Sequence, residues 1–555
     1  MPLSLALVFS KLCREGFMAN KVKIRKEKLS IYLMRDGYSI DSDVIKLENA
    51  KPPIEMDLPE TKFSRLYIKK QPPKSAPPWS KLFTSENKVD ISEFGMPSSV
   101  GAVFVVSLSG ATFILSFGTG FHLLKSEAIE RDFGLKVTLN SVDPDKLRSL
   151  DKASYDQNPL NSRTQSTVDV DIFNLHLDSE MEMLYAVTGT SLVEEFGSNV
   201  TGRDALTIAV EANLSDIPKI LSEAINKYRS KLPAKFSWVE NINRVRDYDE
   251  IELLDMELEQ YLDNKVYDYF WLGEPEIVDW ESQIGYSFDM YQKTLRHVTL
   301  SFDDYISYLN GISPTIAMMK NNVVHVNNSE YQSVKSWPVY RCLYAEITFG
   351  ADNYILRNGV WYKINCDFVS AVDDYLSDLD VHPFKFPVYS HDDEGDYNEH
   401  VSNTEDGFCL MDKKNIQIGG VYDKLEHCDL IRNGNEFVHV KFYRSSSTLS
   451  HLFSQGFVAA EAFIKDKDYR EKLNPKLPDS IKLQDPQLRP NPNDYYVVYG
   501  IATKKNIPKE LPFFSKVTLK NSLKTLRALN YNISLAKIDV DPIWLKTKKC
   551  KPKKN

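Results

Sequence analysis

One stretch of the sequence decides the fold of its C-terminal third: EHCDLIRNGNEFVHVKFYRSSSTLSHLFSQGFVAAEAFI, residues 426–464. An Asn-Gly pair, the strongest short-range signal of a β-hairpin, separates Leu430-Ile431 from a run rich in β-branched and aromatic residues at 437–443. A segment with apolar residues at helical spacing follows. The stretch therefore predicts a strand, a tight turn, a second strand and a helix.

Polar and apolar residues alternate along the second predicted strand. One face carries an imidazole beside an amine, His439 and Lys441, and the other is apolar, with Val438, Val440 and Phe442. Restriction-endonuclease-like phosphodiesterases build a metal site in this way, with a carboxylate such as Asp429 on the preceding strand. The carboxylate binds a divalent cation, and the lysine orients the attacking water or stabilises developing charge. In this chain His439 replaces the acid usually found two residues before the lysine.

The register of the hairpin determines whether such a site can form. With a two-residue loop, Asn433-Gly434, Asp429 lies opposite Val438 and points into the core. With a three-residue loop ending at Asn435, Asp429 lies opposite His439, and apolar residues pair with apolar ones. We prefer the longer loop. The alternative is an ordinary exposed hairpin whose polar face is solvated.

The segments around the hairpin supply further candidate residues. Glu399, in the acidic run 391–401, is expected on a helix facing the hairpin as a second carboxylate. Gln455 lies on the helix after the lysine strand, where it could orient substrate or water. The predicted metal ligands are Asp429, Glu399 and His439, and the predicted ion is Mg²⁺ or Mn²⁺. No pair of residues has the compact spacing of a structural zinc site.

Length and composition predict a multi-domain α/β (α+β) protein. The chain has 555 residues, 42% hydrophobic content and a net charge of −9, which argues against bulk electrostatic wrapping of nucleic acid. We expect an upstream extension (1–17), an N-terminal α+β recognition region (18–340), a restriction-endonuclease-like domain with a mixed sheet and flanking helices (341–545), and a basic tail (546–555). The main boundary is expected within 310–345.

Cysteine usage and hydropathy bear on the cellular compartment. Six scattered cysteines without a CxxC pair are typical of reduced thiols, so a cytoplasmic protein is expected. The apolar run around Ser109-Gly110 reads as a buried hairpin and not as a membrane span. The following GTGFHLL, residues 118–124, lacks the Lys-Ser/Thr pair of a phosphate loop, so it is expected to be a turn into a helix.

Several other elements are predicted from local patterns. A second Asn-Gly hairpin is expected within 353–364, and strands are expected at 28–35, 64–69, 494–503 and 533–540. The expected helices are 126–134, 180–187, 216–230, 250–262, 367–379 and 518–529.

Five segments together resemble a sporadically distributed bacterial family of uncharacterised proteins found near restriction and phage-defence genes. They are AIERDFGLKVTLNSVDPDKLRSLD (128–151), YKINCDFVSAVDDYL (362–376), EHCDLIRNGNEFVHVKFY (426–443), LSHLFSQGFVAAE (449–461) and LPFFSKVTLKNSLKTLRALNYNISLAKI (511–538). The resemblance spans the chain from about Lys28. It implies a role in phage defence but brings no established catalytic residues.

The sequence thus predicts a Mg²⁺-dependent nuclease in phage defence, with nucleic acid as partner and the N-terminal region recognising a phage-derived trigger or a nucleic-acid feature. The alternative is a non-catalytic sensor or adaptor that binds nucleic acid or a phage protein through a degenerate nuclease-like domain. The two differ in one respect: an enzyme needs Asp429, His439 and Lys441 to converge. The oligomeric state, the trigger and the choice among DNA, RNA and nucleotides stay open.

Overall fold

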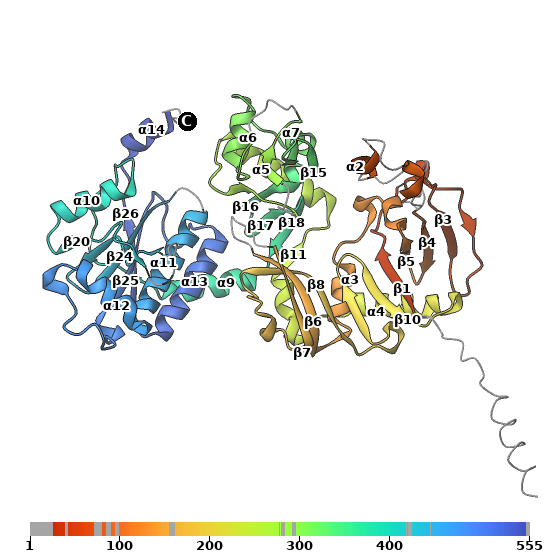
Figure 1. The fold of residues 1–555 in the computed structure, drawn as a ribbon, viewed down its shortest axis with the longest axis horizontal. Coiled ribbons are helices and arrows are strands. Elements are labelled where there is room, and N and C mark those ends of the chain that lie inside the picture. The colour runs from red at the N-terminus through yellow and green to blue at the C-terminus, as the bar shows by residue number, and fades with distance from the viewer. Residues whose placement is uncertain are drawn as a thin grey trace, which may run out of the picture. The chain divides into compact units, whose positions relative to one another are not determined.

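The computed structural model describes residues 26–550 apart from 39–42, 72–79, 85–89, 95–98, 155–160, 277, 279–282, 291–295, 418, 420–423 and 444–445. The expected extension at 1–17 and the last five residues of the expected basic tail lie outside the described residues. The described chain forms two compact units. Unit 1 comprises the residues up to Lys152 together with 162–177 and 184–237, and unit 2 comprises the rest (Figure 1).

A ten-stranded sheet forms the centre of unit 1, with the ends of three strands assigned to unit 2. Its spatial order is β2 (Ile54–Glu55), β3 (Phe63–Ile68), β4 (Gly101–Leu108), β5 (Ala111–Gly118), β1 (Glu27–Leu33), β10 (Leu206–Val210), β9 (Asn199–Gly202), β8 (Glu182–Ser191), β6 (Val142–Ser154) and β7 (Asn161–Val170). The helices are α2 (Lys81–Thr84), α3 (Phe133–Leu139) and α4 (Ile217–Arg229). The β4–β5 hairpin turns at Ser109-Gly110 and is largely buried, as predicted.

The first part of unit 2 contains two antiparallel sheets. One has the order β11 (Ile242–Arg244), β18 (Val360–Ile364), β17 (Asp352–Arg357), β16 (Leu343–Phe349) and β12 (Phe270–Leu272). The other has the order β13 (Gln283–Ser287), β14 (Val323–Asn328) and β15 (Ser333–Pro338). The helices are α5 (Tyr248–Asp263), α6 (Phe302–Tyr308), α7 (Ile316–Asn321) and α8 (Val339–Cys342).

A six-stranded mixed sheet forms the second part of unit 2. Its order is β19 (Asp380–Val381), β26 (Asn532–Ile538), β25 (Tyr496–Ala502), β24 (Glu436–Phe442), β23 (Leu430–Arg432) and β20 (Phe408–Leu410). Strands β19, β26, β25 and β24 run parallel to one another, whereas β23 is antiparallel to its two neighbours, β24 and β20. The helices are α9 (Cys366–Ser377), α10 (Glu394–Thr404), α11 (Ser446–Lys465), α12 (Lys467–Leu473), α13 (Phe513–Ala528) and α14 (Pro542–Cys550).

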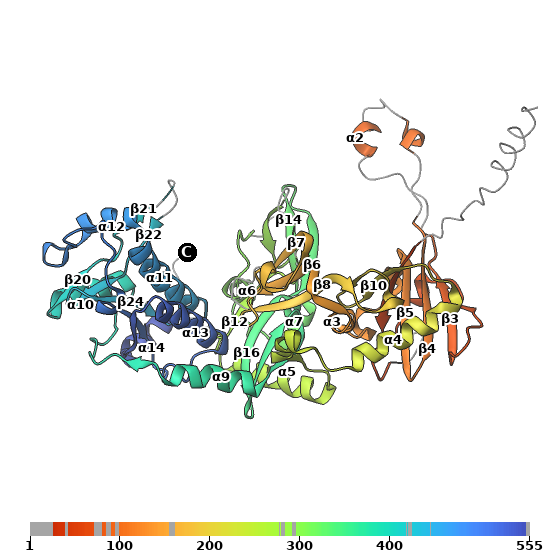
Figure 2. The same ribbon diagram turned by 90° about the horizontal axis from the view of Figure 1, so that it is seen from below.

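Both faces of this sheet are buried, which explains why its central strands are apolar almost throughout. Phe437 and Tyr499 belong to a core that includes residues of α11 and α13. Val438 and Val498 belong to a second core on the other face, which includes residues of α10 and has α14 packed against it (Figures 1 and 2). The sheet is therefore the middle layer of an α/β/α arrangement.

Most predicted elements are confirmed, and two helices need correction. Residues 182–191 form strand β8 and not a helix, because pairing with β9 overrides the helix propensity of the Glu, Met and Leu residues there. At 126–134 the chain forms a 3₁₀ turn at Ser126–Ala128, and helix α3 begins only at Phe133. The helix predicted at 180–187 was therefore wrong, and the helix predicted at 126–134 was correct only in its last two residues.

The prediction of a mixed α and β, multi-domain chain is confirmed. The contact boundary lies between Ser237 and Trp238, and the expected boundary within 310–345 stays a prediction. No helix within the described ranges is both long enough and apolar enough to cross a bilayer.

Candidate metal centre

The hairpin of β23 and β24 has the predicted three-residue loop. Leu430 lies opposite Val438, and Arg432 lies opposite Glu436, so residues 433–435 form the loop. Asn433 and Gly434 have positive φ angles of 53° and 82°, which these two residue types tolerate best. The N–H of Asp429 donates to the Val438 carbonyl at 3.0 Å, at the point where the ladder ends. The predicted three-residue loop and the Leu430–Val438 register are therefore confirmed, and Asp429 lies one residue before the paired positions.

Three carboxylates meet beside this hairpin. Ligand oxygens of Asp412, Glu426 and Asp429 all lie within 4.8 Å of one another, and each residue is partly buried. Among the described residues, this is the one group of three or more potential metal ligands at such spacing. Such a cluster presents hard oxygen ligands, which are the kind that Mg²⁺ and Mn²⁺ prefer.

Backbone hydrogen bonds hold the carboxylates in place. The N–H groups of Met411 and Asp412 both donate to the carbonyl of Asp429 at 2.9 Å, so two residues of one segment oppose the single residue that precedes β23, as in a β-bulge. The N–H of Val440 donates to a carboxylate oxygen of Asp429 at 2.6 Å. The N–H of Lys413 donates to Glu426. The positions of the carboxylates therefore depend on the backbone and not on flexible side chains alone.

Lys441 lies beside the cluster and is held by the first residue of α10. Its ammonium is 2.6 Å from Oε2 of Glu394, and Oε1 of Glu394 accepts the N–H of Phe442 at 3.2 Å. The two side chains are about one quarter exposed, at 25% and 24%. Burial raises the pKa of Asp429 and of Glu426, and the charge of Lys441 opposes part of that rise, so it acts on both carboxylates. A fixed cation thus lies next to the three acids.

The electrostatics of the cluster are unfavourable without a further cation. Burial, together with the charges of Glu426 and Asp412, raises the pKa of Asp429 to about 8, although the Val440 hydrogen bond and Lys441 act in the opposite direction. Burial also raises the pKa of Glu426, and Asp412 adds to the effect. Like charges at this spacing disfavour full ionisation, and a divalent cation would relieve that repulsion. The residues present therefore fit a metal ion.

His439 lies in the core and not among the carboxylates. It is 4% exposed, its ring lies 6.1 Å from that of Tyr499, and burial lowers its pKa to about 4. The imidazole is therefore neutral at pH 7. It does not belong to the cluster of potential ligands found among the described residues.

The two remaining predicted residues are not brought to the cluster by any described contact. Glu399 is exposed on α10, the same helix that contributes Glu394 at its start. Gln455 is half-buried on α11, next to Gly456, which packs against Tyr499. The structure thus places Asp429 near Lys441 but buries His439 in the core, so the predicted convergence of Asp429, His439 and Lys441 is wrong at His439. Glu399 and Gln455 lie elsewhere on their helices.

Sequence reasoning missed three acidic residues: Asp412, Glu426 and Glu394. Asp412 follows β20, Glu426 is three residues before Asp429, and Glu394 lies in the acidic run that pointed to Glu399. Signals for all three existed, since each is next to a predicted element or candidate. Choosing among the acids of residues 391–401 required knowing where α10 begins.

Comparison with known proteins identifies a family and no individual relative. No curated protein and no solved structure matches the chain. The family described as "Family of unknown function (DUF6119)" matches residues 29–539, which is nearly the whole chain. The chain therefore belongs to the DUF6119 family.

Proposed function

We propose that the protein is a divalent-metal-dependent phosphodiesterase that cuts nucleic acid, with its active site at Asp412, Glu426, Asp429 and Lys441. The observation that carries the proposal is the cluster of three carboxylates, whose ligand oxygens lie within 4.8 Å of one another, near Lys441 on β24. The order of elements also supports it, since α10, the antiparallel strands β20, β23 and β24, helix α11 and the parallel strand β25 agree with a restriction-endonuclease-like core. Fold analogy alone would not be enough.

Each residue has a distinct role in this proposal. The carboxylates of Asp412, Glu426 and Asp429 would bind Mg²⁺ or Mn²⁺. The bound ion would supply Lewis-acid stabilisation of the phosphoryl oxygens and a more acidic water. Lys441 would hold the attacking water or stabilise negative charge as it develops on the phosphate. Glu394 fixes the ammonium in position from α10.

The proposed biological role is defence against phage in the cytoplasm, as the genomic setting of the resembling family suggests. Two basic residues of α13 could contact nucleic acid only by giving up an acidic partner. Lys516 contacts Asp373 at 2.7 Å and Lys520 contacts Glu180 at 2.9 Å, so these two cations already have acidic partners.

A cleavage assay tests the proposal. End-labelled single-stranded DNA, duplex DNA and RNA are incubated with the full chain in Mg²⁺, in Mn²⁺ and in EDTA, beside the Asp429→Asn variant. We expect metal-dependent cutting of at least one substrate by wild type and a loss of 100-fold or more in the variant, because a metal ligand is removed. The control is Glu461→Gln, which removes an acid from the Lys465 ion pair on α11.

The outcome also separates the alternative function. Equal cutting by wild type and Asp429→Asn would contradict the proposed active site. Binding of nucleic acid without cutting in either metal would favour the non-catalytic sensor or adaptor.

A further inference from the structure

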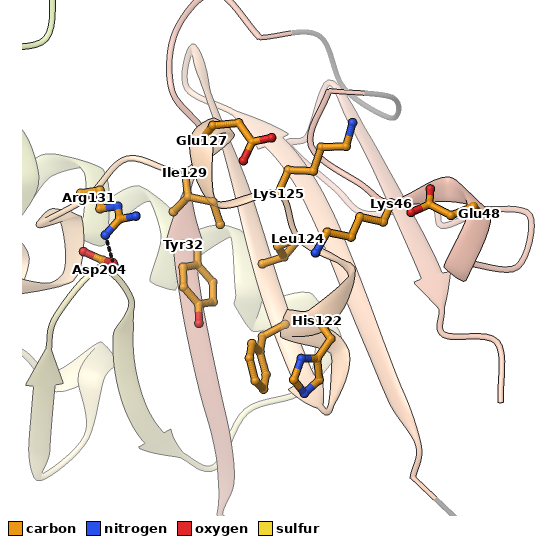
Figure 3. A pocket seen from close by; sticks show the side chains of 11 residues that line it. Tyr32, Lys46, Glu48, His122, Leu124, Lys125, Glu127, Ile129, Arg131 and Asp204 are labelled. Atoms are coloured by element: carbon orange, nitrogen blue, oxygen red, sulfur yellow. Dashed lines mark ion pairs between the residues drawn. The ribbon is translucent and has the colours of Figure 1, made fainter. Parts of the chain in front are cut away.

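Unit 1 contains an open pocket that the proposed nuclease site does not use. Its volume is about 510 Å³, within the usual range for small-molecule sites. Leu124 and Ile129 belong to the core of β4 and β5 and line the pocket with apolar surface. Tyr32 on β1 lines it as well and is partly buried against that core (Figure 3).

An exposed aromatic pair forms one wall of the pocket. Phe121 and His122 lie in the 3₁₀ helix η4 (Gly120–Leu123), with ring centroids 3.9 Å apart. Phe121 is 50% exposed, although a side chain of its size is usually buried. The wall is held against β4, because a Cβ at Gly120 would lie 2.0 Å from the carbonyl oxygen of Ala102. The glycine motif of residues 118–120 therefore serves to present a flat aromatic surface.

One cation in the pocket, Lys46, has no ion-pair partner among the residues that the structure describes. The backbone N–H of Lys46 donates to the Leu123 carbonyl at 2.8 Å, which fixes this residue next to η4. No ion pair or hydrogen bond of the Lys46 ammonium occurs among the described residues. Figure 3 shows the side chain directed toward the middle of the pocket and away from Glu48.

Some of the other charged side chains that line the pocket form an ion pair with one another. Arg131 pairs with Asp204 at 3.8 Å, and Asp204 also accepts the N–H of Asp132 at 3.2 Å. The rim also carries Lys125, Glu48 and Glu127. The hydroxyl of Tyr32 has no hydrogen-bond partner within the described part of the chain. An ammonium and a phenol therefore remain available beside the aromatic wall.

We infer that this pocket binds a phosphorylated nucleoside, with the base on Phe121 and the phosphate on Lys46. Any nucleobase can stack on an exposed aromatic side chain, because every base has a flat π-face. A single lysine supplies a point charge that can bind a phosphate. The hydroxyl of Tyr32 can donate to either part of the ligand. The ligand could be a free nucleotide or a terminal nucleotide of a single strand, which share this chemistry.

Isothermal titration of the full chain in EDTA tests the inference. The probes are AMP, adenosine, inorganic phosphate, and oligo(dA) with and without a 5′-phosphate. We expect AMP or the phosphorylated oligonucleotide to bind, with binding weakened about tenfold or more in Phe121→Ala and in Lys46→Ala, as loss of one stacked base or one phosphate contact implies. Phe117→Ala and Lys51→Ala, at exposed positions of the same unit outside the pocket lining, should bind like wild type.

The two sources separate in the same experiment. Preference for AMP identifies a free nucleotide, and preference for the phosphorylated oligonucleotide identifies a strand end. Absence of binding by every nucleotide probe, or unchanged binding in both pocket variants with their circular dichroism intact, would overturn the inference. Asp429→Asn should bind as wild type does, so failure here is independent of the proposed nuclease activity.

Discussion

Lys441 and Glu394 form an ion pair of 2.6 Å that joins the second strand of the hairpin to the start of α10. The same carboxylate accepts the N–H of Phe442, so both of its oxygens are used. The ammonium is thereby held in one place next to the carboxylate cluster. Positional restraint of a charged group before substrate arrives is a feature of catalytic electrostatics. One quarter of each side chain stays exposed, so solvent partly screens the pair and reduces its contribution to stability.

The first prediction follows from this exposure. Lys441→Met should lower kcat/KM for cleavage by 100-fold or more, because the charge facing the phosphate is lost, and should change stability by less than about 1 kcal/mol. Cleavage kinetics and thermal denaturation measure the two effects. Lys465→Met is the control, because Lys465 also pairs with a glutamate, Glu461, at 2.6 Å. Strong destabilisation by Lys441→Met with unchanged turnover of the folded fraction would show a structural role.

A second prediction concerns the dependence of stability on pH. The pKa of Asp429 is raised to about 8 from its ordinary value of 3.8, so between these values the folded protein holds a proton that the unfolded chain has released. Without metal, this residue therefore makes stability fall as pH rises from about 4 to about 8. Asp429→Asn should be at least ~1 kcal/mol more stable than wild type at pH 8 in EDTA.

The same measurement has a metal arm. Mg²⁺ or Mn²⁺ binds ionised carboxylates, so it should stabilise wild type more at pH 8 than at pH 5 and should not stabilise the Asn variant through this site. Urea or thermal denaturation at the two pH values gives both results. Greater stability of wild type than of the variant at pH 8 in EDTA would contradict a raised pKa of Asp429 in the folded protein.

A third prediction addresses His439, which the sequence suggested as a ligand and the structure places in the core. His439→Leu should keep both the fold and metal-dependent cleavage, because a neutral buried ring is replaced by an apolar side chain. His439→Glu should destabilise by roughly 3 kcal/mol or more, because it places a carboxylate at a site with 4% exposure. Loss of cleavage in a well-folded Leu variant would restore a catalytic role for the imidazole.

A fourth prediction uses the close approach of α10 to the carboxylates. A Cβ at Gly395 would lie 2.7 Å from Nζ of Lys413 and 2.8 Å from Oδ2 of Asp412. Gly395→Ala should thus displace these flexible ends and weaken Mn²⁺ affinity several-fold, while helix propensity leaves stability unchanged or slightly raised. Metal titration and denaturation measure the two effects. Unchanged affinity would indicate that the Asp412 position does not matter for binding.

The hairpin could be predicted from sequence because its determinants are local. The Asn-Gly loop and the alternation of residues 437–442 fix both turn and register, so the positions of Asp429 and Lys441 follow. The burial of His439 could not be predicted in this way. Alternation shows that it shares a face with Lys441, but that face is covered near Tyr499 by α11 and open only toward the end of the strand.

The three acids that could not be chosen from the sequence depend on contacts between distant residues. The N–H of Asp412 donates to the Asp429 carbonyl, the N–H of Lys413 donates to Glu426, and Glu394 at the start of α10 pairs with Lys441, each across more than ten residues. Strand β8 was mispredicted for the same reason, since its partner β9 overrides its local helix propensity. Local patterns therefore predict the elements, and tertiary pairing decides which acids meet.

Manganese titration of wild type and Asp429→Asn at pH 8, followed by electron paramagnetic resonance of free Mn²⁺, tests the metal centre most directly. We expect wild type to remove Mn²⁺ from solution at a site that Mg²⁺ competes for, and we expect the Asn variant and Glu426→Gln to lose that site while Glu461→Gln retains it. Identical titration curves for wild type and Asp429→Asn would contradict the assignment of Asp412, Glu426 and Asp429 as a metal centre.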